Sequence, residues 1–187
     1  MTRSDIIPMV LFGAILVSLG INTPQAANEI IARLFDKSIS NSELQPSQSD
    51  VNRFQAILTD KSEPEIRKIL AQRALGTKIT ESVLADYASK NEIKPTVGEV
   101  ESAYSVIKSW TADLESSLEY SDEDIERYRL LMAKGMAKNW KVSKALYNTY
   151  GGDVVMQQTN PLTPVGAYQE LFEQYREQGE FVIYDPV

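Results

Sequence analysis

The chain has 187 residues, 19 Lys+Arg against 26 Asp+Glu, a formal net charge of −7, and neither histidine nor cysteine. Without histidine there is no imidazole acid–base chemistry, no His-activated nucleophile and no His metal ligand. Without cysteine there are no disulfides, no thiolate metal sites and no Cys-linked lipid. The acidic balance disfavours nucleic-acid binding, which needs a basic face, while an apolar content of 43% is typical of a globular domain.

An uncharged apolar run occupies residues 6–21 (IIPMVLFGAILVSLGI). It is shorter than the roughly 20 residues of a membrane-spanning helix and is typical of a signal-peptide core. Cleavage is expected after Ala26 or Ala27, although Pro24 or Gln25 stands where a small residue is preferred. We expect residues 1–27 to be a cleaved signal peptide; an uncleaved membrane anchor through residues 6–21 and a buried core helix are the alternatives.

The first segment after this leader is predicted to be a strand. Glu29–Phe35 (EIIARLF) is short, apolar and partly β-branched, and Asp36-Lys37 follows as a turn. Residues 38–44 then fit a loop leading into a single helical turn, because Ser40 and Glu43 have the spacing of a capping box.

Helical periodicity begins with residues 51–58, which have apolar side chains at i, i+3 and i+7. Ser62 and Glu65 open a longer helix as a capping box. Gly76 interrupts its apolar stripe, and a kink or a division into two helices is expected there. The stripe consists of Ile66, Ile69, Leu70, Ala74, Ile79, Val83, Leu84 and Tyr87.

Two further helices are predicted. Thr96 and Glu99 form a capping box before a helix with heptad-like apolar spacing. Ser121 caps a long helix that starts with three carboxylates and ends at Gly151-Gly152. The first apolar set is Val100, Tyr104, Ile107, Leu114 and Leu118; the second is Ile125, Tyr128, Met132, Met136, Trp140, Ser143, Tyr147 and Tyr150.

The last 35 residues, 153–187, are predicted to form a strand–helix–strand extension packed on the same domain. Residues 153–158 (DVVMQQ) suit a strand, and Thr163-Pro164 suits a helix start. Phe181–Tyr184 suits a final strand. Because isolated strands are rarely stable, we expect it to share a small sheet with Glu29–Phe35.

Two stretches resemble the SurA-like N-terminal domain of exported parvulin-type chaperones. The family opens with an "IVAxVNGxxITxxEL" pattern, which residues 29–44 match in Ile39, Ser40, Glu43 and Leu44, although Asp36-Lys37 replaces Asn-Gly. Residues 81–104 resemble the family's next helix–loop–helix, matching at Leu84, Ala88, Ile93, Thr96, Glu99 and Val100. The resemblance implies a mainly α, SurA-N-like domain over residues 28–152, with a few short strands from the terminal segments.

The chain departs from that family where catalysis is concerned. A parvulin prolyl isomerase domain built around histidines often follows, whereas this chain has no histidine. Its tail resembles only the first strand and helix of a parvulin domain, with Gln157 or Gln158 in place of the expected histidine. The resemblance therefore implies a chaperone-like fold without isomerase activity, and we expect no enzyme and no cofactor.

The candidate peptide-binding set combines methionine with amphipathic aromatics, which suit a surface for varied apolar peptides. The same helical spacing also suits a plain core, and both interpretations stay open. Trp110 is the strongest groove candidate because it lies off the neighbouring apolar stripe. The set is Tyr104, Trp110, Tyr128, Met132, Met136 and Trp140.

The charged groups favour simpler interpretations. The carboxylates at 122–126 lack the glycine and alternate spacing of a calcium loop, so we expect a charged helix start and no metal site. Lysines at 134, 138, 141 and 144 are expected to form a solvated face rather than a phospholipid contact. No carboxylate pair, such as Glu63 with Glu65 or Glu170 with Glu173, is singled out for hydrolysis.

Together these features predict an exported, non-catalytic chaperone-like protein that binds unfolded or partner polypeptides in the cell envelope, periplasmic or otherwise extracytoplasmic. One alternative is a membrane-anchored interaction or scaffold protein with a single dedicated partner. A hydrolase that uses only carboxylates is a third hypothesis.

Overall fold

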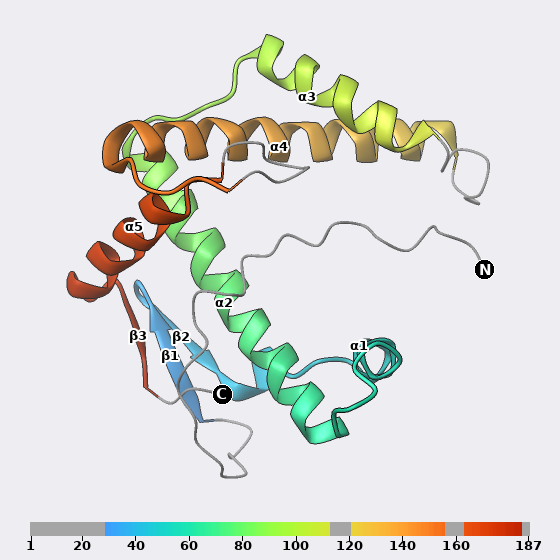
Figure 1. Ribbon diagram of the computed structural model, residues 1–187, viewed down its shortest axis with the longest axis vertical. Coiled ribbons are helices and arrows are strands. Elements are labelled where there is room, and N and C mark those ends of the chain that lie inside the picture. Colours follow the sequence, from blue (N-terminus) through green and yellow to red (C-terminus); the bar gives the residue numbers. More distant parts are fainter. Residues whose placement is uncertain (1–28, 113–120, 156–162, 185–187) are drawn as a thin grey trace. The chain divides into compact units, whose positions relative to one another are not determined.

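The computed structural model describes residues 29–112, 121–155 and 163–184. The predictions for the leader, for Leu114 and Leu118 and for residues 156–158 lie outside this part of the chain. In the described part there are five α-helices and one three-stranded antiparallel sheet, which confirms the expected mainly helical class with a few short strands. Figure 1 shows the elements in chain order.

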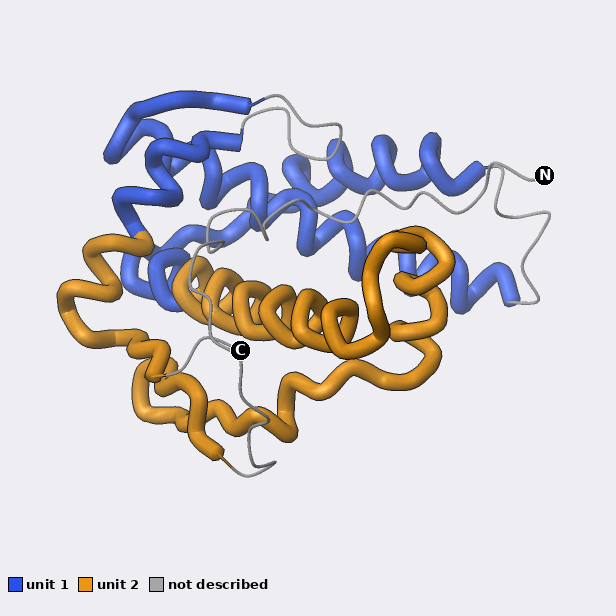
Figure 2. The backbone as a smooth tube through the Cα atoms, turned by 60° about the horizontal axis from the view of Figure 1, so that its bottom comes forward, with its two compact units in different colours: residues 1–9, 86–171 blue, residues 10–85, 172–187 orange. Residues whose placement is uncertain are grey.

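The chain folds as two compact units (Figure 2), and unit 2 is built from segments that are distant in sequence. Of the described residues, unit 1 comprises 86–112, 121–155 and 163–171, and unit 2 comprises 29–85 and 172–184. Helices α2 (Glu63–Lys90) and α5 (Val165–Glu177) each contribute to both units.

Unit 2 contains the sheet. Strands β1 (Ile30–Leu34) and β2 (Lys37–Ser40) form an antiparallel hairpin, and β3 (Phe181–Ile183) pairs antiparallel with the other edge of β1. The order β2-β1-β3 confirms that the first and last predicted strands share a sheet. The loop predicted at residues 38–40 is wrong, because these residues belong to β2.

The hairpin turn of unit 2 is joined to the segment before β3. Phe35 has a left-handed backbone with a φ of 54°, and its ring meets Tyr175 edge-on with centroids 6.2 Å apart. Arg33 donates one hydrogen bond to the Phe35 carbonyl at 2.7 Å and another to the Gly179 carbonyl at 2.8 Å. One guanidinium thus links the β1–β2 turn to the loop that precedes β3.

The helical part of unit 2 follows the predicted capping signals. Ser40 and Glu43 form a capping box on the 3-10 turn η2 (Asn41–Leu44), and α1 runs from Gln48 to Gln55. The Ser62 backbone N–H donates to Glu65 at the start of α2, at 2.8 Å. Helix α2 is continuous across Gly76, so the predicted division is wrong. Buried side chains of this unit include Ile31, Leu34, Ile39, Leu44, Val51, Ile66, Leu75, Ile79, Val83 and Phe181.

Unit 1 is built around α3 (Val97–Trp110) and α4 (Asp122–Tyr150), which lie side by side (Figure 1). Thr96 and Glu99 form the predicted capping box of α3, and Ser121 caps α4 as predicted. Within the described part of residues 153–158, only Val155 pairs, in an isolated bridge with Thr163. Buried side chains of this unit include Ala103, Ile107, Ala133, Ala137, Val142, Leu146, Tyr168 and Leu171.

Candidate functional site

The seam between α3 and α4 is made of small residues. Ala103, Ala133 and Ala137 form a buried cluster. Because alanine has no side chain beyond Cβ, two helices can approach closely there. Three of the six predicted binding residues, Tyr104, Met136 and Trp140, are partly buried against this cluster, together with Val100. In these positions they pack the two helices together.

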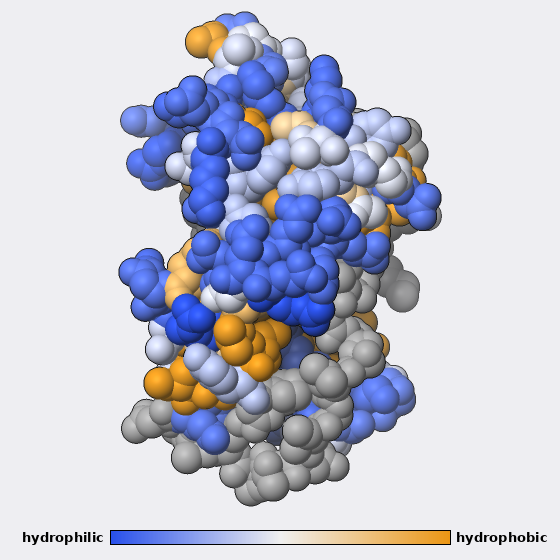
Figure 3. All heavy atoms as spheres, turned by 90° about the vertical axis from the view of Figure 1, so that its left-hand side faces the viewer, coloured by the Kyte–Doolittle hydropathy of each residue, from blue (hydrophilic) through white to orange (hydrophobic). Residues whose placement is uncertain are grey.

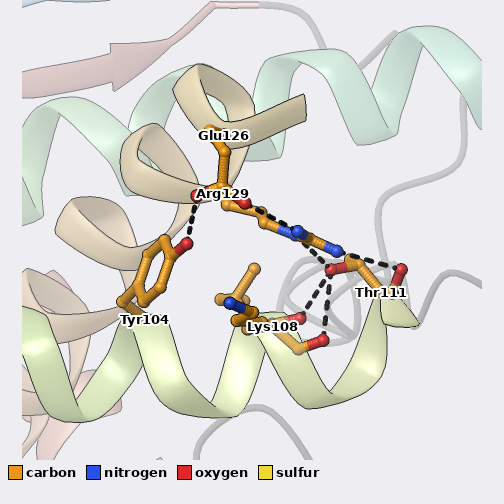
Figure 4. Close-up of polar contacts among 6 residues, drawn as sticks. Tyr104, Lys108, Thr111, Glu126 and Arg129 are labelled. Carbon is orange, nitrogen blue, oxygen red and sulfur yellow. Dashed lines mark hydrogen bonds and ion pairs between the residues drawn. The ribbon is translucent and has the colours of Figure 1, made fainter. Parts of the chain in front are cut away.

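Among the residues that the structure describes, Arg129 of α4 is the largest fully buried side chain, at 2% exposure. Its Nε donates to Thr111 Oγ1 at 2.8 Å, and a second nitrogen donates to the Thr111 carbonyl at 3.2 Å. A third donates to Glu126 Oε1 at 2.8 Å. The positive charge therefore lies at the carboxyl end of α3, where the helix dipole favours a cation (Figure 4).

Glu126 connects this arginine to Tyr104. The Tyr104 hydroxyl donates to one oxygen of Glu126, and Arg129 donates to the other. These two hydrogen bonds, with the Tyr104 bond the larger cause, lower the pKa of Glu126. Figure 4 shows Tyr104 of α3 and Glu126 of α4 pointing toward each other. The network of Tyr104, Glu126, Arg129 and Thr111 holds the two helices in one register.

The other three predicted residues are exposed. Tyr128 and Met132 of α4 are 53% and 40% exposed, and Trp110, the last residue of α3, is 44% exposed. Leu131, which the sequence analysis did not select, is 67% exposed. Residues at i, i+3 and i+4 share one side of a helix. Tyr128, Leu131 and Met132 therefore form one apolar surface, called here the α4 face.

The apolar stripe predicted for α4 is not buried along its whole length. It advances by four residues from Tyr128 to Met132, Met136 and Trp140, and each step of four turns the side chain by about 40° around the helix. The stripe therefore moves from the exposed α4 face onto the α3 seam. Tyr147, another member, is 39% exposed. Arg129, Ala133 and Ala137 occupy the buried side instead.

The second half of α4 is hydrogen-bonded to α5. The Ser143 and Tyr168 hydroxyls hydrogen-bond at 2.8 Å, and both residues are buried. Burial raises the pKa of Tyr168, and the bond from Ser143 partly offsets it. Gly152 and Gly166 also lie in contact, since a Cβ on either would come within 3.0 Å of backbone atoms around the other.

The carboxylates mostly serve helix ends and ion pairs. Glu65 accepts from Ser62, which lowers its pKa, opposite to the shift a general acid needs. Glu63 pairs with Arg67, and Glu173 pairs with Arg176. Among the described residues, no cluster of three or more acidic side chains could hold a metal ion.

The lysines on α4 do not all behave as a solvated face. Lys134, Lys138 and Lys144 are exposed, as expected. Lys141 is half-buried and donates to Glu99 of α3 at 2.9 Å. No helix in the described ranges is long and apolar enough to cross a membrane.

Leu131 and Arg129 were not among the residues predicted from the sequence. Leu131 was visible as an apolar residue three positions after Tyr128 and next to Met132. The signal for Arg129 was the i+4 series Ile125, Arg129, Ala133 and Ala137, in which one cation interrupts an apolar row. Such a position needs a nearby acceptor, which Glu126 and Thr111 provide.

Searches against protein-family models, curated proteins and solved structures gave no match for this chain.

Proposed function

We propose that this is an exported, non-catalytic chaperone-like protein that binds unfolded or partner polypeptides in the cell envelope. The observation that carries the proposal is the α4 face, where Tyr128, Leu131 and Met132 expose apolar side chains side by side on a rigid helix. Single exposed apolar residues are common and need no explanation, but adjacent ones mark an interaction surface.

The chemistry of the α4 face suits varied apolar segments. Methionine is flexible and polarisable and adapts its shape to different partners, while tyrosine combines an apolar ring with a polar tip. Trp110, exposed at the end of α3, adds a second aromatic contact in the same unit. We assign client binding to these residues, and assign Tyr104, Met136 and Trp140 to holding α3 against α4.

The SurA-N-like fold and the export of the chain are part of the same proposal. The matched residues Ser40, Glu43, Thr96 and Glu99 support it, because they form the two capping boxes at the positions that the family pattern implies. The apolar run at residues 6–21 supports an extracytoplasmic location. The missing histidine supports binding without prolyl isomerase activity.

Suppression of aggregation tests the function. The chain is added to a reduced α-lactalbumin solution, and light scattering is followed with and without the double substitution Tyr128→Ser/Met132→Ser. We expect the unsubstituted chain to suppress scattering and the double variant to need about tenfold more protein for the same effect. Ile57→Ser is the matched control, because Ile57 is 68% exposed and lies in unit 2.

Two results would contradict the proposal. One is that the unsubstituted chain leaves the scattering unchanged. The other is that the double variant and the Ile57→Ser control suppress it equally well, which would show that the α4 face has no part in binding. Circular dichroism of all three proteins establishes that the helices are intact.

A further inference from the structure

The α4 face lies on the opposite side of the helix from the α3 seam. Leu131 and Ala133 are two residues apart, about 200° around an α-helix, and one is exposed while the other is fully buried. The first half of α4 therefore packs on α3 along one side and exposes apolar side chains along the other.

A glycine on the same side of α4 has no explanation within the described residues. Gly135 lies in the helix interior, where glycine costs about 1 kcal/mol relative to alanine. A Cβ built on it would meet no heavy atom within 4 Å, so no described neighbour requires its small size. It follows Tyr128 by seven residues, two helical turns, and is itself exposed. The α4 face thus combines large apolar side chains with an open position.

The charges of the exposed part of α4 are divided along its length. Asp122, Glu123 and Asp124 occupy the first turn, and the exposed Lys134 and Lys138 lie three to four turns later. Asp124 also pairs with Arg127 on its own helix, with side chains 46% and 80% exposed. A second α4 aligned in parallel would place like charges together, whereas an antiparallel one places the carboxylates beside the lysines.

One antiparallel register fits both the open position at Gly135 and the distribution of charge along α4. When Tyr128 of one helix lies opposite Gly135 of the other, Leu131 lies opposite Met132 and the pairing repeats about a two-fold axis. The tyrosine ring then occupies the space that glycine leaves open. In this register Asp124 lies opposite Asn139 and next to Lys138, so the opposite charges meet at both ends of the contact.

We propose that two copies of this chain associate through an antiparallel pair of α4 helices, with the α4 face and Gly135 as the interface. This goes beyond the proposed function and does not depend on it. The dimer covers Tyr128, Leu131 and Met132, and only one consequence rests on the proposed function: a bound client and a second copy exclude each other.

Single cysteine substitutions test the register directly, because the chain has no cysteine of its own. The full chain is prepared as Asp124→Cys and as Lys138→Cys, and each is treated with a short thiol–thiol crosslinker, alone and as an equal mixture. We expect a crosslinked product of doubled mass in the mixture. Each variant alone stays uncrosslinked, because identical positions lie about 20 Å apart along antiparallel helices in this register.

A control mixture pairs Asp124→Cys with Glu101→Cys, which places the second thiol at an exposed position of α3; no product is expected. Crosslinking of each variant with itself would indicate parallel helices and overturn the register. A product in the control mixture as large as in the test mixture would indicate unspecific encounter and would overturn the proposal.

Sedimentation of the full chain gives the second measurement. Leu131→Asp and Gly135→Leu are each expected to raise the dimer dissociation constant at least tenfold, by placing a charge or a bulky side chain in the interface. Gly135→Leu at the same time is expected to raise the thermal stability of the monomer, since leucine favours helix over glycine and a Cβ at this position meets no heavy atom within 4 Å. The proposal is refuted if the chain sediments as a monomer at all concentrations. It is also refuted if the chain forms a dimer that neither substitution weakens, which is the result expected if residues 6–21 join the two copies.

Discussion

The Glu99 carboxylate of α3 accepts a hydrogen bond from Lys141 Nζ of α4 at 2.9 Å. The same carboxylate accepts a hydrogen bond from the Thr96 backbone N–H at 2.6 Å, so one side chain both caps its own helix and holds the neighbouring one. The Thr96 bond is the larger cause and the Lys141 bond the next, and together they lower the pKa of Glu99 to about 2.

This lowered pKa predicts an acid-sensitive stability. Glu99 has an ordinary value of 4.5 in the unfolded chain and about 2 in the folded one. Between these values the unfolded chain binds the proton and the folded chain does not, so the contribution of Glu99 is present above pH 4.5 and is lost as the pH falls toward 2. Glu99→Gln should lower stability at pH 7 and flatten the loss between pH 4.5 and 2, as measured by urea unfolding. If the variant loses as much stability between pH 4.5 and 2 as the unsubstituted chain, Glu99 is not the cause of the acid sensitivity.

A second prediction compares two neighbouring arginines that each pair with a carboxylate three residues earlier. Arg129 is buried and Arg127 is exposed. Arg129→Ala removes three hydrogen bonds and leaves a cavity, and should reduce the free energy of unfolding by about 2 kcal/mol. Arg127→Ala should cost less than about 0.5 kcal/mol, because exposed ion pairs contribute little. If chemical denaturation shows that both substitutions reduce the free energy of unfolding equally, burial of Arg129 does not contribute to stability.

A third prediction compares two glycines at the second position of a helix, Gly98 in α3 and Gly166 in α5. A Cβ on Gly98 meets nothing within 4 Å, whereas one on Gly166 comes within 3.0 Å of the Gly152 Cα and the Asp153 N. Gly98→Ala should therefore raise stability by about 0.5 kcal/mol, and Gly166→Ala should lower it by about 1–3 kcal/mol. Thermal melting distinguishes the signs; a stabilising Gly166→Ala would contradict the close approach.

The buried Ser143–Tyr168 pair gives a fourth prediction. Tyr168→Phe and Ser143→Ala each remove the hydroxyl bond between α4 and α5, and each should cost about 1 kcal/mol. The double variant should cost less than the sum of the two, with a coupling energy of about 1 kcal/mol in a double-mutant cycle. Strict additivity would mean that the two hydroxyls do not stabilise each other.

Local signals in this chain were readable from sequence. The capping boxes at Ser40–Glu43, Ser62–Glu65 and Thr96–Glu99 depend on residues three apart, and each lies at a helix start in the structure. The strand at Phe181 was likewise predictable from its short apolar run.

Features that depend on pairing or packing, and have no strong apolar pattern of their own, could not be predicted from the sequence. Strand β2 has a single buried apolar residue, Ile39, and exists because β1 pairs with it. Gly76 does not divide α2, because a glycine costs only about 1 kcal/mol in a helix and packing of the surrounding turns exceeds that. The buried side of α4 was not identified, because it consists of alanines and a paired arginine, and neither is conspicuous in an apolar pattern.

The order β2-β1-β3 has a consequence for how the chain reaches this fold. Strand β1 lies in the middle of the sheet, yet one of its two partners follows all of the described part of unit 1 in the chain. Pairing two strands that are this far apart in the sequence has a large entropic cost of loop closure, and this cost slows folding. We therefore expect unit 2 to finish folding last. Until β3 pairs with β1, one edge of β1 stays unpaired, and this partly folded state is the one prone to aggregate. A protein proposed to shield other chains would itself pass through a stage that needs shielding.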